Sequence, residues 1–140
     1  MSEPDYLAAG ETLKTLLSPL KAKGLREVFL ATDLAQVADL GQYHPAIHIV
    51  YQGERPLEAS QSGRVSSAEQ IWLVLLVHRA TPNQASAGIW LWRILQAVAG
   101  RPFASSVFSR AASPARPSYK GGVAYLPLAF TVTVKFKGER

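Results

Sequence analysis

The chain has 140 residues, of which 48% are hydrophobic and 18% charged, and this fits one compact domain over residues 1–140 with little room for a second. Because it contains no cysteine, a disulfide framework, thiolate metal ligands and a cysteine nucleophile are excluded. The net charge of +5 is unevenly distributed, since residues 1–69 carry nine acids and six bases (−3) whereas residues 70–140 carry nine bases and one acid (+8).

The first third of the chain predicts two helices separated by a strand. Pro4 and Asp5 resemble the first turn of a helix, and leucines from Leu13 to Leu20 then recur at helical spacing until Pro19 and Gly24 end it. Residues 28–31 are apolar and predict a short strand. Thr32 or Asp33 is expected to cap one or two helical turns through Ala38, which Gly41 closes.

The middle third predicts two strands joined by a long polar loop. His44-Pro45 favours extended backbone, and residues 46–51 are β-branched and aromatic enough to form a strand. Residues 52–67 are polar and contain three turn-forming residues, so we expect a long loop that could contact a partner. The strand at residues 70–78 is apolar on both faces, which predicts a central strand covered on both sides by helices or by another subunit.

The last third predicts a helix, a loop and a final strand. Asn83 or Ser86 can cap a helix that runs to Ala99. Residues 103–122 are expected to be an extended loop with at most one short strand, and Pro127 marks a start, edge or bulge of the strand at residues 123–137. The side chains expected to face inward on that strand are Leu126, Leu128, Phe130, Val132, Val134 and Phe136.

The order α-β-β-β-α-β therefore predicts an α+β fold, in which helices pack on a face of one mostly antiparallel sheet of about four strands. The acidic N-terminus has no apolar signal core, and the longest apolar run, residues 71–77, is too short to cross a bilayer. These features predict a soluble intracellular protein that does not engage a membrane.

Sequence signals for catalysis are missing. No phosphate-binding glycine loop, nucleophile elbow or zinc-binding helix motif occurs. His48 and His78 lie on neighbouring predicted strands and could approach each other, but two histidines without a carboxylate make a poor metal site. We expect both to be strand residues with a hydrogen-bonded partner, and His44 to be a turn residue. The sequence predicts no enzyme activity, no cofactor, no metal and no catalytic residue.

The basic second half of the chain allows two interpretations. A positive band could face nucleic acid, and the candidate residues are Arg116, Lys120, Lys135 and Lys137. Aromatic residues for base stacking are few, with Phe103, Tyr119 and Tyr125 as the only candidates nearby. The same lysines could instead be solvated and protect an edge strand.

Self-assembly would explain several features together. A subunit with an acidic and a basic patch can join head to tail, and such contacts close into a ring when the rotation allows. Trp90 and Trp92 project on roughly opposite sides of the predicted helix, so one of them could anchor an interface. The alternative is that both are core residues beneath the long loops. Candidate interface residues are Trp72, Trp90, Trp92, Arg93 and Arg101.

Five stretches of the chain resemble the tail terminator (tail completion) proteins of long-tailed bacteriophages and prophages. They are residues 25–29, 33–35, 45–53, 70–74 and 124–130, and together they span most of the chain. The resemblance is a pattern of strands and spacers, and no individual functional residue can be carried over from it.

The resemblance implies a structural virion protein at the neck end of the tail, assembled in the host cytoplasm. Such a protein forms a ring, expected to be a hexamer, that caps the tail tube, stops its polymerisation and offers a joining surface to the head connector or neck protein. DNA passes through the lumen transiently. Candidate contacts to tube and neck are in residues 103–122 and 52–67, the latter including Glu54, Arg55, Glu58 and Arg64. A neck or head-closure connector and a basic nucleic-acid-binding module remain the alternatives.

Overall fold

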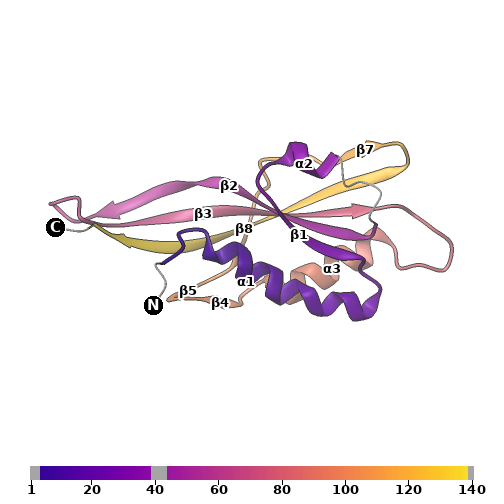
Figure 1. The fold of residues 1–140 in the computed structure, drawn as a ribbon, viewed down its shortest axis with the longest axis horizontal. Helices are drawn as coiled ribbons and strands as arrows, with labels where there is room; N and C mark the ends of the chain where they lie inside the picture. The colour runs from indigo at the N-terminus through magenta and orange to yellow at the C-terminus, as the bar shows by residue number, and fades with distance from the viewer. Residues whose placement is uncertain (1–3, 39–43, 139–140) are drawn as a thin grey trace.

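A long twisted sheet with helices on both faces forms the centre of the computed structural model, which describes residues 4–38 and 44–138 (Figure 1). Within these residues the sheet has six strands, in the order β1-β2-β3-β8-β6, with β7 also paired to β8. Their bounds are β1 Glu27–Ala31, β2 Ala46–Ala59, β3 Val65–His78, β6 Ser109–Ala111, β7 Ser118–Lys120 and β8 Val123–Lys137. A separate small hairpin consists of β4 Pro102–Phe103 and β5 Ser106–Val107.

The predicted α+β class is confirmed. Only β1 and β2 are parallel, and the other pairs in the sheet are antiparallel. The four strands expected from the sequence are β1, β2, β3 and β8, and the short β6 and β7 extend that sheet. The helices are α1 Ala8–Leu17, a 3-10 helix η1 Ser18–Lys23, α2 Leu34–Ala38 and α3 Ala87–Val98.

The helix boundaries follow local signals, with one difference at the N-terminus. The first α-helix starts at Ala8 rather than at Pro4, and its last turns narrow to the 3-10 helix η1 around Pro19. Gly24 ends η1 with a φ of 108°, which a glycine adopts without strain. Ser86 caps α3, because its side chain accepts a hydrogen bond from the Ile89 amide. Asp33 Oδ1 likewise accepts one from the Gln36 amide, at 3.3 Å, whereas Gly41 lies outside the described residues.

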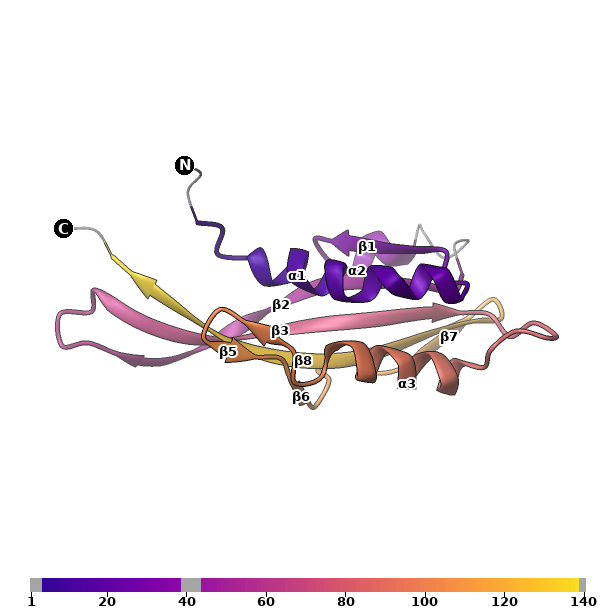
Figure 2. The same ribbon diagram turned by 90° about the horizontal axis from the view of Figure 1, so that it is seen from below.

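The apolar segment of β3 is central and buried on both faces, as predicted. One face, which includes Trp72 and Val74, packs against α1 and α3 in the main core. The opposite face, which includes Leu73 and Leu75, packs in a second core that contains Val37 of α2 and, at its margin, parts of residues 111–115. The sheet therefore has helices on both faces, with α1 and α3 on one side (Figure 2).

The prediction of a long loop at residues 52–67 is wrong. β2 continues to Ala59 and β3 begins at Val65, so the turn between them is only residues 60–64. The Ser60 amide donates to the Val65 carbonyl at 2.7 Å and closes it. The register shifts after Tyr51, where Gly53 has a φ of 105°. The polar sequence misled the prediction because strands with little burial need no apolar alternation.

Residues 103–122 are also more ordered than predicted, since parts of four short strands lie there. β7 pairs with residues 123–125 of β8 and β6 with residues 129–131. Pro127 falls between them, at a position where β8 has no outer partner among the described residues. This confirms its assignment to a local edge.

One end of the sheet extends beyond the helices (Figures 1 and 2). It consists of residues 51–59 of β2, 65–71 of β3 and 131–137 of β8, and we call it the arm. Phe136, expected to face the core, lies there with 54% of its surface exposed. The prediction was wrong because α1 and α3 do not cover this end of the strand.

Candidate assembly surfaces

The three tryptophans occupy different environments. Trp72 and Trp90 are each only 3% exposed and belong to the main core of this chain, so they are not available to a neighbouring subunit. The indole of Trp72 donates to Gln70 Oε1 at 3.0 Å. Trp92 is 64% exposed, on the face of α3 that also carries the exposed Ile89. Of the three, only Trp92 remains an interface candidate.

The two candidate interface arginines also differ. The guanidinium of Arg93 lies 4.7 Å from the centre of the Trp90 ring, and its Nη1 is buried without a hydrogen-bond partner among the described residues. Arg101 follows α3 and is exposed. Arg93 therefore supports the fold of its own chain, whereas the Arg101 side chain is free to meet a partner.

The sheet order converts the charge split of the sequence into a split across the molecule. β1 and β2 come from the acidic half of the chain and lie toward one edge of the sheet, where they carry three glutamates and one arginine. β6, β7 and β8 lie toward the opposite edge, the basic side of the sheet, and carry four basic residues and no acid. The predicted DNA-facing residues Arg116, Lys120, Lys135 and Lys137 are all exposed on this basic side.

Stacking aromatics are sparse there. Tyr119 is 74% exposed beside Lys120, but Tyr125 is half-buried against the second core. Phe103 packs near Phe108 beside the main core. Phe136 is also exposed, but it lies at the opposite end of β8 from Tyr119. Two rings so far apart give a weak platform for single-stranded nucleic acid.

The residues predicted to contact tube and neck lie on the arm. Glu54, Arg55 and Glu58 are exposed on β2, and Arg64 lies in the turn, where its Nε donates to the Gly138 carbonyl at 2.8 Å. Arg55 forms an ion pair with Glu69 at 3.4 Å.

Two tyrosines meet Glu54 at the base of the arm. The Tyr51 hydroxyl donates to Glu54 Oε1 at 3.0 Å, and burial together with this carboxylate raises the pKa of Tyr51 to about 12. The pKa of Tyr6 is raised by the same two causes, again with burial the larger. Both hydroxyls therefore remain protonated donors at neutral pH.

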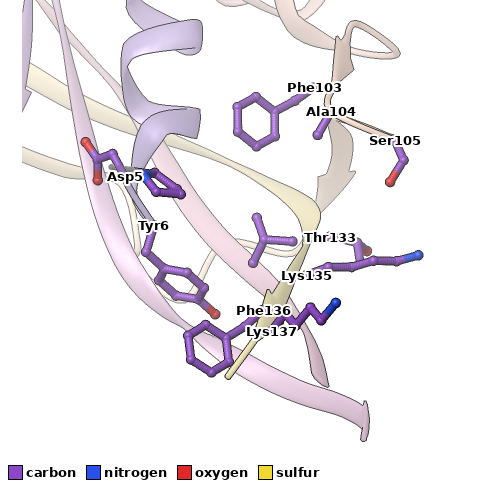
Figure 3. A pocket seen from close by; sticks show the side chains of 11 residues that line it. Asp5, Tyr6, Phe103, Ala104, Ser105, Thr133, Lys135, Phe136 and Lys137 are labelled. Atoms are coloured by element: carbon purple, nitrogen blue, oxygen red, sulfur yellow. The ribbon is translucent and has the colours of Figure 1, made fainter. Parts of the chain in front are cut away.

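A hollow of about 820 Å³ lies against the arm, between residues 4–6, the β4–β5 hairpin and the end of β8. Figure 3 shows the rings of Tyr6, Phe103 and Phe136 lining it, with Lys135 and Lys137 at one side. Sequence analysis missed this surface because its residues come from three distant parts of the chain.

The histidines do not form a pair. His48 projects into the second core and His78 toward the main core, because they lie on opposite faces of the sheet. His78 Nε2 is 3.0 Å from the Ala85 carbonyl, which confirms its expected hydrogen bond. For His48 that expectation is wrong: neither ring nitrogen has a partner among the described residues, and the ring stacks on Phe29. Burial lowers the pKa of His48 to about 4, and it also lowers the pKa of His44.

The described residues contain no group of three or more His, Cys, Asp or Glu side chains placed to hold a metal. None of their helices is long and apolar enough to cross a membrane.

Comparison with known proteins places the chain in a family. The family model described as "Phage tail terminator protein" matches residues 3–140. That family is one of structural proteins. No curated protein matches the chain. Because the match covers nearly the whole sequence, this protein belongs to the phage tail terminator family.

Proposed function

We propose that this protein caps the phage tail tube as a homo-oligomeric ring, expected to be a hexamer, and so terminates tube polymerisation. The family match over residues 3–140 carries the proposal. The outer face of the ring offers a joining surface to the head connector or neck protein. DNA passes transiently through the lumen, and the protein acts without catalysis or cofactor.

The surface of the single chain supports assembly. An indole that is 64% exposed on α3, next to an exposed isoleucine, is costly to leave in water. The strands that carry the acidic residues and the strands that carry the basic residues lie toward opposite edges of the sheet. A head-to-tail contact would bring these two edges together, and such a contact closes into a ring when the rotation between subunits allows.

The arm and the segment at residues 103–122 are the proposed contacts to tube and neck. The arm extends from the helix-covered body and presents Glu54 and Glu58, with Arg64 in the turn at its end. The segment at residues 103–122 lies along β8 through β6 and β7, and its residues 116–122 are exposed. The exposed basic residues Arg116, Lys120, Lys135 and Lys137 are the proposed lining of the DNA passage.

The decisive experiment mixes the purified protein with polymerising tail tube protein. We expect native mass spectrometry to give a ring, and electron microscopy to show tubes that stop growing and carry one capped end. A chain that stays monomeric at high micromolar concentration, with tubes of unchanged length, would refute the proposal. Rings that bind the head connector but leave tube growth unchanged would identify a neck or head-closure protein instead.

A nucleic-acid-binding module is the alternative that the exposed basic side of the sheet supports. A salt titration of DNA binding separates the two functions. Tight binding with a slope that implies several phosphate contacts would favour this alternative, whereas a passive lumen binds DNA weakly.

A further inference from the structure

The arm has two open strand edges at the same level. Beyond Val50 no strand pairs with the outer side of β2, and beyond Thr131 none pairs with the outer side of β8, within residues 4–38 and 44–138. Ser66 of β3 pairs with Ala59 of β2 on one side and with Phe136 of β8 on the other, so β2 and β8 extend equally far along the arm. The arm is therefore a three-stranded ribbon with no strand paired along either side, although the β4–β5 hairpin lies beside β8 at Thr133.

The open edge of β8 presents main-chain hydrogen-bonding groups. The Thr133 amide donates to Ser106 Oγ at 3.2 Å and so points away from β3. Because such groups alternate along an antiparallel ladder, those of Lys135 and Lys137 point outward as well. A free edge of this kind is a template for pairing with a further strand.

The two edges carry opposite charge. β8 presents Lys135 and Lys137, neither of which has an ion-pair partner within 4 Å among the described residues. β2 presents Glu54 and Glu58, whereas its Arg55 is paired with Glu69. Two β8 edges would repel each other, as would two β2 edges, so the charges favour pairing of unlike edges.

The side chains beside the β8 edge also suit a neighbour. Phe136 stands between the two lysines with 54% of its surface exposed. A strand added along this edge would cover the flank of its ring and remove apolar surface from water.

We propose that the outer edge of β8, residues 134–137, pairs with the outer edge of β2, residues 54–59, of a second copy of this chain. The sheet then continues from subunit to subunit through the arms. β2 and β8 run in the same direction because both are antiparallel to β3, so the new pair is parallel. Pro56 has no amide hydrogen to donate, so it limits the number of main-chain hydrogen bonds that the new pair of strands can form. The proposal rests on the proposed ring and names its contact.

Disulfide trapping tests the contact directly, because the chain has no cysteine of its own. Within one chain, Ser67 of β3 pairs with Lys135 of β8 and lies opposite residues 57 and 58 of β2. Residues 57 and 58 therefore occupy the same position along the arm as Lys135. Adjacent strands are about 4.8 Å apart, within reach of a disulfide. We expect Lys135→Cys combined with Glu58→Cys to give a ladder of covalent oligomers on mild oxidation. Each single-cysteine variant should stay uncrosslinked, since the contact joins unlike edges.

Charge reversal gives an independent readout of the same contact. Lys135→Glu with Lys137→Glu should raise the apparent dissociation constant of the oligomer by roughly tenfold or more. Adding Glu54→Lys and Glu58→Lys to that variant exchanges the charges of both edges and should restore assembly. Lys14→Glu with Lys23→Glu makes the same change of charge on α1 and η1, away from both edges of the arm, and serves as the control. Circular dichroism checks that every variant is folded.

The outcomes distinguish the contact from the ring. If wild-type rings form and cap tubes, but the double-cysteine variant does not crosslink and edge charge reversal acts like the control, the edge contact is wrong and the ring stands. A dimer from Lys135→Cys alone would show that like edges pair, which also overturns it. A wild-type chain that never assembles overturns both proposals.

Discussion

Replacing Gly10 with alanine tests how tightly α1 packs on the sheet. A Cβ at this position would lie 2.8 Å from both Cη2 and Cζ3 of Trp72 and 3.1 Å from Leu30 Cδ2. The indole cannot withdraw easily, because it is 3% exposed, is hydrogen-bonded to Gln70 and lies 5.2 Å from the Tyr51 ring, centre to centre. Either the helix or the indole must therefore shift by about half an ångström or more to reach ordinary contact distances.

The opposing contributions can be compared. Alanine is favoured over glycine inside a helix by about 1 kcal/mol, and overpacking a well-packed core costs roughly 1–3 kcal/mol. We expect Gly10→Ala to lower the free energy of unfolding by about 1 kcal/mol despite its better helix propensity. Urea denaturation followed by circular dichroism measures this change, at a protein concentration where the midpoint no longer depends on concentration.

Gly88→Ala is the matched control on α3. Its Cβ would meet only Ser86 Oγ, at 3.9 Å, so we expect stability to be unchanged or raised by up to about 1 kcal/mol. Trp72→Phe removes the two atoms that Gly10→Ala would strike, and in that background the alanine should cost little or nothing. Equal stabilisation by Gly10→Ala and Gly88→Ala would show that this reasoning is wrong.

Three further predictions concern pH, capping and assembly. Burial lowers the pKa of His48 to about 4 from an ordinary 6.5, so the unfolded chain binds more protons between these values. The free energy of unfolding should therefore fall by up to roughly 3 kcal/mol as the pH drops through this range, and a His48→Leu variant with the same pH dependence would contradict this. Ser86→Ala removes the cap of α3 and should lower that free energy by about 1 kcal/mol, which a urea midpoint equal to wild type would disprove. Arg101→Glu should weaken assembly, measured by light scattering, without changing the stability of the monomer. Arg93→Glu should also lower the melting temperature, because it loses the contact with Trp90. Identical melting curves for the two variants would show that Arg93 does not support the fold of its own chain.

Part of the candidate surface was predictable from sequence. The exposure of one of two tryptophans follows from their spacing on an amphipathic helix, because residues two apart project about 200° apart. Which tryptophan is buried depends on how α3 rotates against β3, and here Trp90 takes the core position. The hollow beside the arm could not be predicted, because its three rings meet only after the chain has folded.

The sequence by itself determined the parts governed by local periodicity and turn chemistry. These are α3, whose cap was narrowed to Asn83 or Ser86, the strand at β1, the two-sided burial of β3 and the α+β class. Only the tertiary structure decided where polar strands lie. Residues 52–59 and 65–69 form strands because hydrogen bonding to a neighbouring strand supplies partners that their side-chain pattern does not reveal. The order of the strands depends on contacts between distant parts of the chain. That order also placed the strands of the acidic half and those of the basic half toward opposite edges of one sheet.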